Sequence, residues 1–92
     1  MERKRTRLQI IHDILQVIRA RNGKIKPTHI LYKSNLSHQM MEEYLRELIS
    51  NKFIIEHIGV KGKTYSITKR GGEYLAQYST LSSFMDSFGL SQ

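Results

Sequence analysis

The chain has 92 residues, enough for one domain with a single modest core and too few for a large catalytic cleft. It contains no cysteine, which excludes disulfides, thiolate metal sites and a cysteine nucleophile. Fifteen Lys and Arg against eight Asp and Glu give a formal net charge of +7, and an excess of this size suits a polyanion such as a phosphate backbone. A generally basic protein without such a partner is the alternative.

The positive charge is unevenly distributed along the chain. Residues 1–33 carry nine Lys and Arg and two acids, and residues 59–72 carry four basic residues and no acid. No run approaches the roughly 18 apolar residues of a membrane span. The first residues lead into an amphipathic pattern and do not resemble a signal peptide. We therefore expect a cytoplasmic protein with no membrane partner.

The first predicted element is an amphipathic helix that starts after Thr6 and stops near Gly23. Thr6 and Gln9 have the spacing of a capping box, and glycine suits a left-handed helix stop. Residues 24–26 alternate in polarity, which favours a short strand pairing with a later hairpin as its third member. The apolar stripe of the helix is predicted to contain Leu8, Ile11, Ile14, Leu15 and Ile18.

Two further helices are predicted around a tight turn. Pro27 suits the first turn of a second helix, which we expect to end near Ser34. Asn35 tolerates a positive φ and Ser37 is a favoured N-cap, so a third helix is expected over residues 38–50. Its inner face is predicted to hold Met41, Tyr44, Leu45, Leu48 and Ile49.

A β-hairpin and a last helix are predicted from the remaining sequence. Residues 53–58 and 63–67 are rich in β-branched and aromatic side chains, and the glycines between them permit a turn with a basic tip. Thr68 can cap a fourth helix, although Gly71 and Gly72 weaken its first turn. Residues 74, 78, 81, 85 and 88 have the alternating spacing of helices that pair. They can instead pack onto the first helix, so contacts within the chain and with a second copy both remain open.

The fold class expected from these elements is α+β and mostly helical. We predict a winged helix-turn-helix, in the order helix, short strand, two helices, strand, wing and strand, with an added C-terminal helix. A helix fits the DNA major groove and a basic ribbon reaches an adjacent phosphate track, so duplex DNA is the expected partner. Residues 1–70 are expected to bind DNA, and residues 71–92 to dimerise within the same domain. Candidates for the homodimer interface are Tyr78, Leu81, Phe84, Met85 and Phe88.

Several segments together resemble the archaeal winged-helix DNA-binding proteins typified by the Sulfolobus coiled-coil chromatin protein. The segments are residues 28–33, 35–37, 44–45, 54–55 and 65–71, with Leu48 as a further match, within a resemblance over about residues 7–76. It implies that the third helix recognises DNA, that the wing touches DNA, and that a C-terminal helix pairs two protomers. The implied function is a dimeric transcriptional regulator or a chromatin-architectural protein, associated with the nucleoid.

The chain departs from that family at two places. Relatives usually end the third helix with glycine, whereas this chain has Lys52, which either sits strained or leaves the stop to Asn51. Better-known relatives carry a long charged C-terminal helix, whereas the tail after Gly72 is short and aromatic here. We therefore expect two-fold pairing without a long antiparallel coiled coil.

The candidates for contacting bases lie at the start of the third helix, namely Ser37, His38, Gln39 and Glu42. Gln39 can make a bidentate pair with adenine, and His38 can donate to a base or a phosphate. Ordinary solvated first-turn residues are the alternative. Glu42 and Glu43 repel phosphate, so they accept from a cytosine amine, pair with Arg46 or Arg5, or mark a helix that enters the groove only at its tip.

The candidates for contacting phosphates are basic or hydroxyl side chains around that helix. Lys61 and Lys63, at the hairpin tip, have the strongest case, although a lysine at a tip also serves solubility. Residues 3–7 form either a flexible arm for a minor groove or a solvated N-terminus. The full set is Arg3, Lys4, Arg5, Thr28, Lys33, Ser34, Arg46, Lys61 and Lys63.

The sequence gives no support to catalysis or to ligand chemistry. Its four histidines fall on separate elements without metal-ligand spacing, and no glycine-rich cradle stands between a strand and a helix. We expect no enzyme activity, no metal, no cofactor and no small-molecule substrate. The alternative function is a winged-helix module that binds protein and not DNA. The acidic pair at positions 42 and 43 favours that alternative, and the basic wing opposes it.

Overall fold

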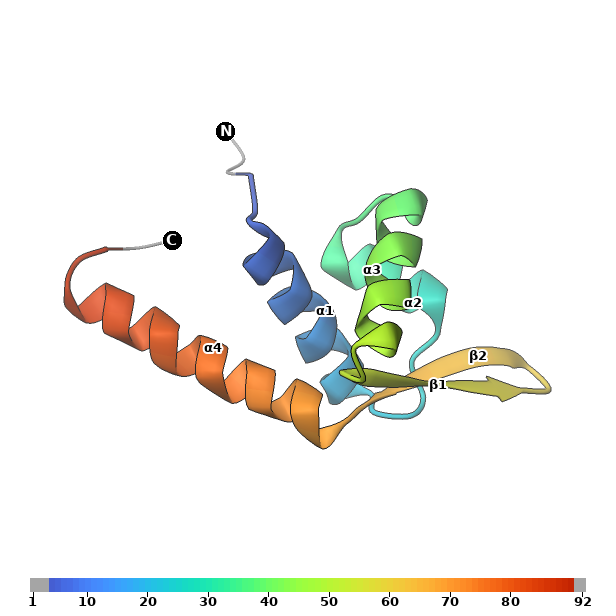
Figure 1. Ribbon diagram of the computed structural model, residues 1–92. Helices are drawn as coiled ribbons and strands as arrows, with labels where there is room; N and C mark the ends of the chain where they lie inside the picture. Colours follow the sequence, from blue (N-terminus) through green and yellow to red (C-terminus); the bar gives the residue numbers. More distant parts are fainter. Residues whose placement is uncertain (1–3, 91–92) are drawn as a thin grey trace.

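The computed structural model describes residues 4–90. Its elements follow the predicted order, with a helical body, a two-stranded hairpin projecting from one side and a C-terminal helix extending from the other (Figure 1). No helix in residues 4–90 is long and apolar enough to cross a bilayer. The elements are α1 (Arg7–Ala20), α2 (Pro27–Ser34), α3 (His38–Ser50), β1 (Ile54–Gly59), β2 (Gly62–Ile67) and α4 (Lys69–Ser87).

Helix α1 forms the centre of the core. The predicted capping box is confirmed, because the Thr6 hydroxyl accepts from the Gln9 amide at 3.2 Å and the Gln9 side chain accepts from the Thr6 amide at 2.7 Å. Elements α2, β2 and α4 all pack against α1, so Ile10, which lies off the main stripe, is buried as well. Leu8 is exposed, and its predicted place in the core is wrong because α1 is only starting there.

The predicted third strand is reduced to a single bridge. Ile25 pairs antiparallel with Tyr65, whose amide donates to the Ile25 carbonyl at 3.1 Å. The chain enters α2 at Pro27 directly afterwards, and proline has no N–H with which to continue a ladder. The sheet within residues 4–90 thus has two strands, paired antiparallel from Ile54 opposite Ile67 to Gly59 opposite Gly62.

The turn between α2 and α3 has the local chemistry that its sequence predicts. Asn35 adopts the left-handed conformation at φ 53°, and the Ser37 hydroxyl accepts from the Met40 amide at 3.1 Å. Leu36 is buried and fixes the turn to the core. On α3, Met41, Leu45 and Leu48 are buried, whereas the other two predicted inner residues, at positions 44 and 49, are half-buried.

Helix α3 ends at a strained position. Asn51 is the C-cap, and Lys52 follows at φ 63°, in the left-handed region that glycine occupies most easily. Of the two alternatives for the end of this helix, the strained Lys52 is the one observed. Its carbonyl accepts from the Thr68 hydroxyl at 2.7 Å, which ties the end of α3 to the start of α4.

Helix α4 begins in the core and leaves it. The Thr68 hydroxyl caps the helix by accepting from the Gly71 amide at 3.1 Å, and Gly71 and Leu75 are its buried residues. The helix continues through the serine-rich residues 79–83 for 19 residues in total, a length of about 28 Å. Its C-terminal half stands away from the rest of the molecule (Figure 1).

Candidate nucleic-acid interface

Helix α3 and the hairpin form the two sides of one groove of about 490 Å³. Helix α3 contributes His38, Glu42 and Arg46, and the hairpin contributes Glu56, Lys63 and Tyr65. The fold therefore brings the predicted recognition helix and the basic wing onto one surface, although they lie about 20 residues apart in the sequence.

The start of α3 is open to solvent. Ser37, His38 and Gln39 are all exposed, and the Ser37 hydroxyl is partly used as the helix cap. His38 Nδ1 lies 3.7 Å from a Glu42 carboxylate oxygen, so Glu42 pairs within its own helix and not with Arg46 or Arg5. An exposed pair of this length contributes little to stability, which leaves both side chains available to a ligand.

Glu56 is a residue of the groove that the sequence analysis did not single out. Its carboxylate accepts from the Tyr65 hydroxyl at 3.0 Å and lies 3.7 Å from Lys63 Nζ. Burial, and then the hydrogen bond to Glu56, raise the pKa of Tyr65, so its hydroxyl remains a donor even at alkaline pH. The cross-strand pairing of Glu56 with Tyr65 is the signal that would have located this residue.

The two wing lysines differ in their surroundings. Lys63 has its charge partly balanced by Glu56, whereas Lys61 is exposed and forms no ion pair within residues 4–90. Lys61 is therefore the more available of the two for a phosphate.

The N-terminal segment is fixed at Arg5. Its guanidinium forms a salt bridge with Asp13 at 2.8 Å and donates to the Asn35 carbonyl at 3.0 Å. The flexible-arm alternative is wrong for this residue, because its donors are used to hold the segment against α1 and the turn before α3. Lys4 is exposed, and Arg3 lies outside the described residues.

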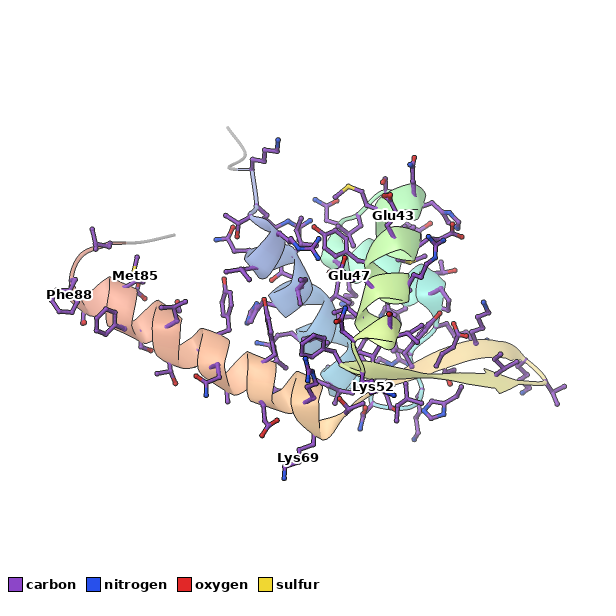
Figure 2. All side chains as sticks on the ribbon, in the orientation of Figure 1. Glu43, Glu47, Lys52, Lys69, Met85 and Phe88 are labelled. Carbon is purple, nitrogen blue, oxygen red and sulfur yellow. The ribbon has the colours of Figure 1, made fainter. Side chains whose placement is uncertain are left out.

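Helices α1 and α3 are also joined by an ion pair. Arg7 pairs with Glu47, and its guanidinium lies 5.6 Å from the centroid of the Tyr44 ring. Figure 2 shows Glu47 on the side of α3 that faces α1, away from the hairpin. These acidic and basic groups balance each other on a face that is not part of the groove.

Of the three α2 residues predicted to contact phosphate, two are accessible to solvent. Thr28 and Lys33 are exposed. Ser34 is only 1% exposed, and its hydroxyl has no hydrogen-bond partner within the described part of the chain. The prediction for Ser34 is wrong, because a phosphate cannot reach a side chain enclosed between helices.

The residues proposed for dimerisation divide into two groups. Tyr78 stacks on His12 of the same chain, with ring centroids 4.2 Å apart, and Met85 is half-buried. Leu81, Phe84 and Phe88 are 47%, 59% and 66% exposed. Figure 2 shows Met85 and Phe88 near the far end of α4, remote from α3 and the hairpin.

Within residues 4–90, no three His, Asp or Glu side chains are grouped so that they could hold a metal ion. Three of the cationic residues that the sequence analysis did not name lie close together. Arg21, Lys24 and Lys26 lie around the start of α2, beside the groove between α3 and the hairpin. The charge count over residues 1–33 was the signal that could have located them.

Known proteins resemble this chain in sequence and in fold. The chain is 34% identical over 68 residues to MJ0290 of Methanocaldococcus jannaschii, a match that covers 74% of this chain and 29% of that protein. The chain thus spans less than a third of that relative.

Solved structures share the fold. Sso10a-2, described as a DNA-binding protein from Sulfolobus solfataricus, superposes with a TM-score of 0.75 at 20% identity, covering 91% of this chain and 85% of that chain. MepR, a transcription regulator from Staphylococcus aureus, superposes with a TM-score of 0.75 at 15% identity, covering 86% and 60%. MepR in complex with DNA gives a TM-score of 0.69 at 15% identity, covering 91% and 62%. The sequence model of the family described as winged helix-turn-helix matches residues 4–86, and the chain belongs to that family.

Proposed function

We propose that this protein binds duplex DNA as a dimeric regulator of transcription or as an architectural protein, with the start of α3 in the major groove and the wing on phosphates. The observation that supports this most directly is the groove between α3 and the hairpin, since it joins an exposed helix start to a basic ribbon. Structural neighbours described as a DNA-binding protein and as a regulator in complex with DNA agree with the proposal.

The proposed base contacts come from the first turns of α3. In the proposed complex Gln39 pairs with an adenine edge, and Ser37 and His38 donate to bases or phosphates; the exposure of all three side chains supports this. Glu42, on the same face one turn later, accepts from a cytosine amine in this arrangement.

The proposed phosphate contacts surround that helix. Lys61 and Lys63 contact one track from the wing, and Arg46 contacts phosphate from within the groove. Thr28 and Lys33 on α2, with Lys4 ahead of α1, complete the set, and each of these side chains is exposed. Because such contacts release condensed counterions, the logarithm of the affinity is expected to fall with the logarithm of salt by about 0.9 per phosphate.

We also propose that the C-terminal half of α4 pairs two protomers. Leu81, Phe84 and Phe88 present a continuous apolar strip at spacings of three and four, and the Phe84 and Phe88 rings lie 5.0 Å apart. Burial of each side chain against a second copy is worth about 1.5–3 kcal/mol. The proposed dimer then has two copies of the DNA-binding unit of residues 1–70. The buried first half of α4 attaches each unit to its helix.

The test of DNA binding compares Lys61→Ala/Lys63→Ala with a charge-matched control, Arg19→Ala/Lys69→Ala. Arg19 lies in the groove between α1 and α4, and Lys69 starts α4 away from α3 (Figure 2). Fluorescence anisotropy with random-sequence duplex over a range of salt should give a slope that is shallower by about 1.8 for the wing variant and unchanged for the control. Absence of binding at low salt would refute the proposal and favour the protein-interaction alternative.

The test of dimerisation is the mass of the protein in solution. Phe84→Ser/Phe88→Ser should change a dimer into a monomer, while Gln77→Ser on the same helix should leave the mass unchanged. Multi-angle light scattering measures both. A dimer that survives the double substitution would place the interface elsewhere on the molecule.

A further inference from the structure

A second basic surface lies outside α3 and the wing, where α1 turns into α2. We call Arg21, Lys24, Lys26 and His29 the basic turn. Together with Thr28 and Tyr32 these residues line a hollow of about 400 Å³ on the surface, and none of the lining residues is acidic. Within residues 4–90, none of the three cations Arg21, Lys24 and Lys26 forms an ion pair with a carboxylate. Their charges are therefore not balanced by the protein.

The backbone of the basic turn is held rigidly by strand β2. The Gly23 amide donates to the Tyr65 carbonyl at 2.8 Å, and the Ile67 amide donates to the Asn22 side chain at 2.7 Å. The Lys24 amide donates to the Arg21 carbonyl at 2.9 Å, closing the turn, and Gly23 supplies the positive φ of 81° that the turn requires. Binding by a preorganised turn loses less conformational entropy than binding by a loose loop.

Two further features favour an anion at this position. Arg21 Nη1 lies 3.0 Å from His29 Nδ1, so the guanidinium donates to the ring and is held in one orientation. Lys26 is the N-cap of α2 but makes no side-chain cap hydrogen bond, and the first turn of α2 contains no acid. Pro27 has no N–H and the His29 amide donates to the Lys26 carbonyl at 3.1 Å, so in that turn it is the Thr28 amide that adds partial positive charge to the surface.

The basic turn is continuous with the groove between α3 and the hairpin. Pro27, the first residue of α2, lines that groove, and its neighbours Lys26 and Thr28 line the hollow. A duplex seated on α3 would bring its backbone past the start of α2. Tyr32, which is 75% exposed, stands at the edge of the hollow, where its ring can pack against a sugar.

We propose that the basic turn binds phosphates of the same duplex beyond the segment contacted by α3, with Arg21 and Lys24 each engaging one phosphate. This inference rests on the proposed DNA-binding function. Guanidinium groups bind phosphate through paired hydrogen bonds, and an ammonium group binds it as a point charge. A free phosphate anion shares that chemistry, so the test must separate the two sources.

The test compares Arg21→Gln/Lys24→Gln with the charge-matched control Arg19→Gln/Lys69→Gln. Anisotropy with a duplex of about 30 base pairs, roughly three helical turns, should show a salt slope shallower by about 1.8 for the first variant and unchanged for the control. Equal slopes for the two variants would overturn the proposal, because the effect would then be one of net charge. Lys24→Gln alone, which leaves the end of α1 intact, should make the salt slope shallower by about 0.9.

Amide chemical shifts identify the source of the phosphate. The Gly23 and Lys24 signals should move saturably with added duplex and not with inorganic phosphate at an equal phosphate concentration. Saturable movement with inorganic phosphate, together with an unchanged salt slope for the double variant, would overturn the proposal in favour of a free-anion site. If the wild type does not bind duplex, the proposed function fails. If only the wing variant alters the slope, the inference about the basic turn alone fails.

Discussion

Replacing Gly71 by alanine should weaken the junction between α4 and the hairpin, whereas the same change at Gly72 should strengthen the helix. A β-carbon at Gly71 would lie 2.4 Å from the Phe53 carbonyl oxygen and 2.6 Å from Ile67 Cγ1. The Ile67 side chain can rotate away, but the Phe53 carbonyl is backbone and accepts from the Thr68 amide at 3.0 Å. Relief of the clash therefore requires α4 to move away from the core.

The magnitude follows from two opposing effects. Overpacking of this kind costs about 1–3 kcal/mol, and alanine in place of glycine within a helix gains at most about 1 kcal/mol. At Gly72 the β-carbon meets nothing within 4 Å, so only the gain remains. The free energy of unfolding of the two variants should thus differ by about 1–3 kcal/mol, with Gly71→Ala the less stable.

Urea unfolding followed by circular dichroism, at one protein concentration, measures this difference. In a thermal scan each kcal/mol corresponds to about 4–8 °C for a domain of this size. Equal stability of Gly71→Ala and Gly72→Ala would refute the reasoning, because it would show that α4 does not pass this close to Phe53.

Three other predictions concern stability and ionisation. Lys52→Gly should raise the free energy of unfolding by about 0.5–1 kcal/mol in urea titrations, because relief of the left-handed strain outweighs the added freedom of the unfolded chain. A lower free energy of unfolding would argue against strain at this position. Ser34→Ala should raise it by about 1 kcal/mol, since a buried hydroxyl without a partner is removed, and a decrease would reveal a bonded hydroxyl. The pKa values of Tyr65, Tyr74 and Tyr78 are raised, chiefly by burial, so their protonated forms favour the folded state. Their contribution to the free energy of unfolding should be constant below about pH 10 and should fall as the pH rises further. Tyr65→Phe should reduce this loss of stability at alkaline pH. A spectrophotometric titration in which all tyrosines ionise near pH 10 would contradict the prediction.

Some basic residues of this protein form ion pairs within the fold, and others keep their charge for the proposed interface. Arg5 forms an ion pair with Asp13, and Arg7 forms one with Glu47. Much of the positive charge near the N-terminus therefore stabilises the fold. Lys61 and the basic turn remain without carboxylate partners in the described residues. Net charge alone therefore overstates the number of phosphate contacts that this surface can make.

The local sequence determined most of the elements of this protein. The capping box of Thr6 and Gln9, the left-handed Asn35 and the Ser37 cap are interactions among neighbours in the chain, and they are confirmed. The winged helix-turn-helix fold follows from the order of such elements, and the family match agrees with it. Periodicity also predicts which face of a helix is apolar, because helical neighbours are spaced three and four residues apart.

Tertiary structure decided which polar residues were left for function. Ser34 is buried, Arg5 pairs with Asp13, and Glu56 enters the groove, although nothing within a few residues of each indicates these outcomes. The burial of Ser34 and the position of Glu56 in the groove depend on contacts between segments distant in sequence, and Arg5 reaches Asn35, 30 residues away, as well as Asp13. A single-sequence pattern carries little information about such contacts. The strand expected at residues 24–26 became one bridge for the same reason: the position of β2 and the start of α2 set how far it could pair.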